Sequence, residues 1–226
     1  MSSVFVHKAE ARRQFREFAE GEITNANLAR GALLIALEDY AGLDVGAYLG
    51  QLDALAGRVS RRRSGGEPPI FQLGHLHAEM FDVDGYRGDA VSYYDPRNVY
   101  LNEVIDRRLG LPISLSIIFL HVAERIGLCA SGVGLPGHYI VKVQFELNEV
   151  YIDPFHAGTT MTMPEIGEML SQITGGRARL SSDHLRSWSG RETLLRVLGN
   201  LQSMWMRAGD QRKAASALER IEILRP

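Results

Sequence analysis

The stretch GHYIVKVQFELNEVYIDPF, residues 137–155, places a histidine and an aspartate beside two strand-like runs. His138 precedes the first run, and Asp153 lies near the end of the second. Alternating apolar residues around a polar turn are typical of a β-hairpin, so we expect a hydrogen bond between His138 and Asp153 to hold its ends together. A histidine oriented by an aspartate also supplies two of the three members of a nucleophilic triad, which raises the question of the nucleophile.

Three side chains could supply that nucleophile, but each has a simpler structural role. Ser114 and Ser116 lie near the start of an apolar segment, where a serine hydroxyl commonly bonds to a nearby backbone group. We favour that role for both and keep Ser114 as a weak substitute nucleophile. The single cysteine, Cys129, follows the far end of the segment and has small or apolar neighbours, so we expect a buried packing residue.

A metal site is the second chemistry that this region could support. His156 follows Asp153 by three residues, so His138, Asp153 and His156 could converge as two imidazoles and one carboxylate. No fourth ligand is evident in the sequence, and we therefore expect neither a metal nor a cofactor. The other helical histidines do not suggest a paired site, because His75 and His77 are two residues apart and do not share a helix face, and His121 has no carboxylate four residues before or after it.

The elements that position these residues follow from the hydrophobic periodicity. Spacing of three and four residues predicts helices over residues 9–20, 25–40, 43–63, 69–81, 95–110, 112–127, 163–173, 192–209 and 211–224. Alternation predicts strands over 132–135, 139–145 and 149–155, with a turn at 146–149 and a loop at 82–89. The segment 112–127 is apolar nearly all round and should be a central buried helix. Helices before and after a small antiparallel sheet indicate an α+β fold.

Polar residues around the motif DPRN have two possible roles. Asp95 and Asn98 are good capping and turn residues, and Arg97 can bridge to a nearby carboxylate. The alternative is a polar recess beside the histidine, lined by the following candidates: Tyr94, Arg97, Asn98, Asn102 and His156.

Composition excludes several classes of protein. The 226 residues are 45% hydrophobic and 23% charged, enough for a normal core, and the formal net charge of −2 gives no basic field for nucleic acid. One cysteine cannot form an internal disulfide or a cysteine-rich zinc site. The N-terminus has no apolar run of signal-peptide length, and no segment is long enough to span a membrane. We therefore expect a cytoplasmic protein that binds neither nucleic acid nor membrane, with its oligomeric state open.

The last two predicted helices resemble one tetratricopeptide (TPR) unit, with an ordinary helical hairpin as an equal alternative. The residues that fit the repeat are Asn200, Leu201, Trp205, Gly209, Asp210, Ala214, Leu224 and Pro226, whereas Gln202 and Ile221 depart from it. One unit cannot cover its own apolar face. Either the chain is truncated after one unit, or the hairpin packs on the rest of the protein.

Several motifs together resemble the bacterial SirB-type family, in which a transglutaminase-like region precedes TPR units. They are YYDPRNVYLN, RRLGLPISL, GLPGHYIV and IDPF, and the resemblance covers roughly residues 25–226. It implies a papain/transglutaminase-like core, a central helix packed on an antiparallel sheet. We place the domain boundary between residues 1–187, which include the N-terminal helices, and the TPR-like hairpin at 188–226.

The resemblance also implies roles for the chemical residues. His138 and Asp153 match the histidine and aspartate of transglutaminase-like enzymes, and Pro112 stands where those enzymes carry the nucleophilic cysteine. Proline has no group that could form the covalent bond. We therefore expect a non-catalytic, regulatory module, a pseudoenzyme that binds a protein or peptide partner. The alternative is a hydrolase or acyltransferase that uses Ser114 with His138 and Asp153, or a metal-assisted variant.

Overall fold

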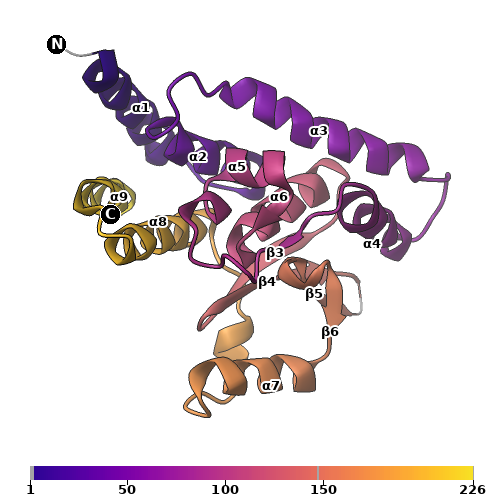
Figure 1. Ribbon diagram of the computed structural model, residues 1–226. Coiled ribbons are helices and arrows are strands. Elements are labelled where there is room, and N and C mark those ends of the chain that lie inside the picture. Colours follow the sequence, from indigo (N-terminus) through magenta and orange to yellow (C-terminus); the bar gives the residue numbers. More distant parts are fainter. Residues whose placement is uncertain (1–2, 147, 226) are drawn as a thin grey trace.

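The computed structural model describes residues 3–146 and 148–225, and Figure 1 shows helices packed around one small sheet. The N-terminal helices are α1 (Ser3–Glu20), α2 (Asn25–Leu37), α3 (Val45–Arg62) and α4 (Pro69–His77), the last continuing as a π-helical turn over Ala78–Val83. Helix α3 begins as predicted, because the carboxylate of Asp44 accepts a hydrogen bond from the Ala47 amide at 2.9 Å.

The segment predicted as one helix over 95–110 is divided in two. A 3-10 turn, η2 (Pro96–Asn98), is followed by extended Tyr100 and then by α5 (Leu101–Arg107). Asp95 does cap the first turn, accepting from the Arg97 amide at 2.9 Å. The prediction of a continuous helix was wrong because tertiary contacts, not local propensity, decide this segment.

The end of α5 explains part of that error. The helix stops at Arg108, which adopts a left-handed conformation with φ 60°, and not at Gly110. The next two residues form β2 (Leu109–Gly110). This strand pairs in parallel with β1 (Arg87–Gly88), which lies inside the segment 82–89 that was predicted as a loop. Strands of two residues carry no detectable periodicity, so their pairing is visible only in the structure.

Helix α6 (Pro112–Arg125) is the central buried helix, as predicted. Pro112 occupies its first turn, where a missing amide hydrogen costs nothing, and all of the next eleven residues are buried. The amide of Leu111, just before the helix, donates to the carbonyl of Asn98 at 2.9 Å. This bond fixes the start of α6 against η2.

The main sheet contains four antiparallel strands in the order β3 (Ala130–Leu135), β4 (His138–Gln144), β5 (Glu149–Asp153) and β6 (Thr159–Met161). The first three match the predicted strands, and β6 was missed because three residues are too few to show alternation. Leu147, inside the turn predicted between β4 and β5, lies outside the described residues.

The two faces of the sheet are covered by different helices. Tyr139, Val141 and Val143 of β4 belong to the main core with α6, whereas Ile140 packs in a second cluster with Ile166 of α7 (Met163–Thr174). This alternation is the period of two expected of a strand buried on both faces. Helix α7 lies on the far side of the sheet from α6 (Figure 1).

The C-terminal helices α8 (Gly190–Arg207) and α9 (Gln211–Leu224) form the predicted hairpin and pack back on the N-terminal helices. The indole of Trp205 donates to the Tyr100 hydroxyl at 3.1 Å. Buried Arg220 donates to the carbonyl of Ile35 at 2.6 Å and lies 3.7 Å from carboxylate oxygens of Glu38 and Asp39. Apolar residues of both helices belong to the main core. Of the residues fitted to a TPR unit, Pro226 lies outside the described part of the chain.

The fold is therefore α+β, as the order of elements predicted. Within the described residues, every helix is too short or too polar to cross a lipid bilayer.

Candidate functional site

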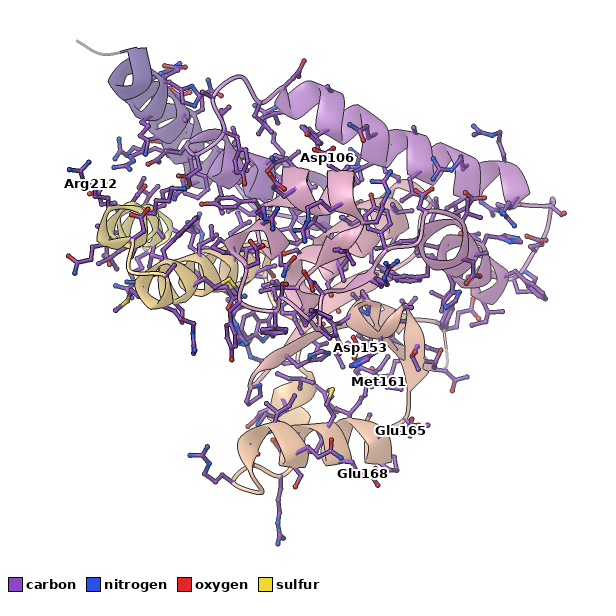
Figure 2. The ribbon with its side chains drawn as sticks, in the orientation of Figure 1. Asp106, Asp153, Met161, Glu165, Glu168 and Arg212 are labelled. Atoms are coloured by element: carbon purple, nitrogen blue, oxygen red, sulfur yellow. The ribbon has the colours of Figure 1, made fainter. Side chains whose placement is uncertain are left out.

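His138 and Asp153 meet at one end of the β4–β5 hairpin. Strand β4 begins at His138 and β5 ends at Asp153, and antiparallel pairing brings these ends together. Nε2 of His138 donates to Oδ2 of Asp153 at 2.8 Å, and the residues are 6% and 1% exposed. Asp153 lies near the middle of the molecule in Figure 2. The hydrogen bond expected from the sequence is present.

Asp153 is held as a carboxylate. Burial by itself raises the pKa of Asp153, but hydrogen bonds and charge from His138 and then His156 outweigh it, so the pKa is lowered. An ionised carboxylate can only accept hydrogen bonds, which assigns the proton between His138 and Asp153 to Nε2. Nδ1 of His138 makes no hydrogen bond within the described residues and is not sealed from solvent.

His156 binds the same carboxylate oxygen. It belongs to the 3-10 turn η3 (Pro154–His156), and its Nδ1 lies 2.8 Å from Oδ2 of Asp153. The other oxygen, Oδ1, accepts from the amides of Phe155 at 2.9 Å and His156 at 3.4 Å. Ligand atoms of His138, Asp153 and His156 all lie within 4.8 Å of one another. The two-histidine, one-carboxylate cluster considered from the sequence is therefore assembled.

A cleft of about 440 Å³ lies beside His138 and the first residue of α6. Pro112 and His138 both line it, so the residue at the expected nucleophile position faces the space that the histidine borders. The full lining consists of Tyr93, Tyr94, Leu111, Pro112, Ile113, Gly137, His138, Tyr139, Ile173, Arg196 and Asn200. Asp153 and His156 do not contribute, so the carboxylate lies behind the histidine ring as seen from the cleft.

The three alternative nucleophiles lie elsewhere. The buried hydroxyl of Ser114 donates to the carbonyl of Val99 at 3.3 Å, and that of Ser116 donates to the carbonyl of Pro112 at 2.8 Å. Neither lines the cleft. Cys129 is exposed, so the expectation of a buried packing residue was wrong. It directly precedes β3, where its carbonyl accepts from the Gln144 amide while the side chain points outward.

Of the recess predicted around DPRN, only Tyr94 lines the cleft. Exposed Arg97 is bound to Asp95, and its guanidinium reaches the carboxylate at 2.6 Å. Buried Asn98 donates to the carbonyl of Ser92 at 2.7 Å and accepts from Arg107 at 3.1 Å. These contacts brace the turn before α5 and correct the predicted recess, because Asp95 and Arg97 pair with each other and Asn98 is bonded to Ser92 and Arg107.

The remaining members of that recess also lie outside the cleft. Asn102 is buried in α5, and its Oδ1 has no hydrogen-bond partner within the described residues. His156, with 64% of its side chain exposed, does not line the cleft.

The other histidines have partners that sequence spacing alone does not reveal. Nε2 of His121 lies 2.8 Å from a carboxylate oxygen of Asp53, which comes from α3. Nε2 of His75 lies 3.1 Å from Glu67, just before α4. The first contact joins two helices that are far apart in the sequence, and the second is local to the start of α4.

Sequence reasoning missed the wall of the cleft that α8 supplies. Arg196 and Asn200 are both half-buried and line the cleft, and one guanidinium nitrogen of Arg196 donates to the carbonyl of Leu135 at 3.4 Å. They are four residues apart in a helix whose other side is apolar, so they share a face. That spacing is the signal that could have identified them. Burial raises the pKa of Tyr93, which lines the same cleft, although Arg196 opposes the shift.

Comparison with known protein families gives a match over the part of the chain that carries the site. A family model described as the transglutaminase-like superfamily matches residues 46–199, which include the central helix, the sheet and the histidine–aspartate pair. No solved structure matches the chain.

Curated relatives come from bacteria and from animals. A UPF0162 protein of Xylella fastidiosa (strain Temecula1) is 36% identical over 203 residues, covering 86% of this chain and 70% of the relative. A UPF0162 protein of Vibrio cholerae is 27% identical over 124 residues, 54% of this chain and 46% of the relative. F-box only protein 21 of Mus musculus is 27% identical over 149 residues, which are 61% of this chain but 22% of that protein. By the family model, this chain belongs to the transglutaminase-like superfamily, and the Xylella relative places it among the UPF0162 proteins.

Proposed function

We propose that this protein is a non-catalytic transglutaminase-like module that binds a protein or peptide segment in the cleft beside His138. One observation carries the proposal: Pro112 lines the cleft at the start of α6, where a covalent mechanism requires a nucleophile. We also propose that it acts in the cytoplasm and that it is a SirB-type protein whose hairpin is a TPR unit.

The chemistry of the cleft supports binding without reaction. Among the described residues, no serine, threonine, cysteine or lysine side chain lines it. The phenol of Tyr139 is a poor substitute, because it is buried and hydrogen-bonded to Thr193 at 2.7 Å, and burial raises its pKa. His138, oriented by Asp153, could accept a proton from a nucleophile, but the lining offers no suitable nucleophile to form a covalent intermediate.

The same lining suits an extended peptide with an acidic group. This lining includes Leu111, Pro112 and Ile113, and Tyr94, which also lines the cleft, is 57% exposed. Arg196 is the one permanent cation among the described lining residues and can pair with a carboxylate. Apolar walls with a few polar groups are typical of sites that bind ligands.

The alternative of a serine-dependent hydrolase has less support. The Ser114 hydroxyl is 1% exposed and donates to Val99, so a substrate carbonyl could reach it only if the start of α6 moved. The metal-assisted alternative depends on a cluster of which only His138 lines the cleft, whereas Asp153 and His156 do not.

The experiment that tests the proposal exposes the purified protein to fluorophosphonate and iodoacetamide probes and measures intact mass and adduct position. We expect alkylation of exposed Cys129 only. A Cys129→Ser variant should then remain unmodified. Labelling of Ser114 or Ser116 that disappears in a His138→Ala variant would contradict the proposal and establish the serine mechanism.

A further inference from the structure

The cluster behind His138 has the dimensions of a metal site. Nε2 of His138 and Nδ1 of His156 each lie 2.8 Å from Oδ2 of Asp153. Ligands bound at about 2.1 Å to one ion lie about 3.0–3.4 Å apart at octahedral or tetrahedral angles. Insertion of an ion therefore requires each imidazole nitrogen to move from the carboxylate oxygen by a few tenths of an ångström. The two nitrogens, which lie within 4.8 Å of one another, must also come to lie no more than about 4.2 Å apart.

The carboxylate is already oriented for such an ion. Amides of Phe155 and His156 hold Oδ1 of Asp153, which leaves Oδ2 as the ligand atom. Outer hydrogen bonds of this kind fix the direction of a metal-binding carboxylate. The ring of Phe155 packs edge-on against the rings of His138 and His156, at centroid distances of 6.0 and 5.3 Å. Both imidazoles are thus restrained around the same oxygen.

We propose that His138, Asp153 and His156 bind one divalent first-row transition metal ion, with Zn²⁺ as the ion to test. Two imidazoles and one carboxylate suit this class of ion better than Mg²⁺ or Ca²⁺, which prefer oxygen ligands throughout. The exposed side of His156 gives water access to the remaining coordination position. This role goes beyond peptide binding, because Asp153 and His156 do not line the cleft.

Metal binding changes what His138 presents to the cleft. Without the ion, the proton is on Nε2 and a neutral ring leaves Nδ1 as an acceptor. With the ion on Nε2, the proton resides on Nδ1, and His138 becomes a hydrogen-bond donor toward the cleft. In neutral His156 the proton moves from Nδ1 to Nε2 in the same way, so protons balance without an acid or base being consumed. The effect of this change on a bound peptide rests on the proposed function of the cleft.

The test is a competition titration of chelator-treated full chain with Zn²⁺ and a chromophoric chelator. We expect one tight site per chain and an affinity loss of about tenfold or more in His156→Ala, comparable to losses from disturbed metal sites. His156 is exposed, so this variant should fold. His184→Ala removes a histidine whose partner is Ser181 and should bind Zn²⁺ as the wild type does. Absence of a stoichiometric site, or unchanged affinity in His156→Ala, would overturn the proposal.

Nitrogen-15 NMR of the histidine rings provides the second measurement. Zn²⁺ should shift Nε2 of His138 and Nδ1 of His156 in the wild type, and unchanged resonances would refute ligation. Peptide binding is measured separately: a chain that binds Zn²⁺ but no peptide refutes the cleft function alone, and a chain that binds peptide but no Zn²⁺ refutes the metal site alone.

Discussion

A cysteine introduced at Pro112 should acquire the low pKa of a catalytic thiol. The substitution is made in a Cys129→Ser background, so that the exposed native thiol does not react. Loss of the proline ring costs about 0.4–1 kcal/mol through the unfolded state, and the variant should remain folded. The new thiol would begin α6 and border the cleft that His138 lines.

Two contributions lower the pKa of that thiol. The N-terminus of the 14-residue α6, whose N-cap makes no side-chain hydrogen bond, favours an anion by about 0.3–1 kcal/mol. A second contribution arises if His138, anchored on Asp153 and lining the same cleft, accepts the thiol proton, because a neighbouring imidazolium lowers the pKa of a thiol by about one to three further units. From an ordinary value of about 8.5, the pKa should fall to about 7 or below, so the thiolate fraction at neutral pH rises from about 3% to at least about half.

The assay is the pH dependence of alkylation by iodoacetamide, whose midpoint reports the thiol pKa. A second variant that also carries His138→Ala should move the midpoint up by about one unit or more, because only the helix contribution remains. If the midpoint stays near 8.5 and is insensitive to His138, then Pro112 does not occupy the nucleophile position, and the reasoning fails.

Three further predictions concern the groups that hold the site and the hairpin in place. Asp153→Asn should lower the free energy of unfolding by about 1–3 kcal/mol at pH 7, since it weakens the buried hydrogen bond to His138 and the partly buried one to His156. Because the folded pKa of Asp153 is lowered, this stabilisation is present above the unfolded pKa and disappears as the pH falls through the folded value, which urea unfolding from pH 7 to pH 2 measures. Gly88→Ala should cost about 1–3 kcal/mol, because its Cβ would lie 2.4 Å from Cδ2 of Phe155, and it should perturb the NMR signals of His156. Arg220→Met should lower the free energy of unfolding, measured with urea, by about 3–5 kcal/mol, because it removes a positive charge beside the buried carboxylates of Glu38 and Asp39.

Each of these has a control and an outcome that would contradict it. If the free energies of unfolding of the wild type and of Asp153→Asn ran parallel down to pH 2, the histidines would not lower the pKa of the Asp153 carboxyl group. Gly65→Ala, where the added methyl group meets open space, should be nearly neutral, and an equal loss in both glycine variants would exclude the Phe155 contact as the cause. Exposed Arg225→Met is the control for Arg220, and equal effects would rule out the buried ion cluster.

The sequence predicted the parts of the fold that local patterns determine. Asp44 caps α3, Pro112 starts α6, and the limits predicted for α9 agree with Gln211–Leu224. The pairing of His138 with Asp153 could also be predicted, because antiparallel strands joined by a short turn leave little choice of register.

Residues whose roles depend on distant contacts could not be assigned in this way. Arg196 reaches the cleft from a helix far along the chain, and Asp53 on α3 supplies the carboxylate that His121 lacks within its own helix. The break before α5 has the same origin, since the carbonyl of Asn98 binds Leu111 at the start of α6. In these places tertiary hydrogen bonds override local propensity.

Peptide binding without turnover is the central claim, and a peptide array followed by fluorescence polarisation tests it most directly. Peptides selected on the purified wild type should include acidic sequences, and their affinity should fall about tenfold in Arg196→Ala, the loss of about 1.4 kcal/mol typical of a charged hydrogen bond. The exposed control Arg225→Ala should bind normally, and mass spectrometry should recover every peptide unchanged. Peptides that bind equally to Arg196→Ala, or that return hydrolysed or acylated, would contradict the account.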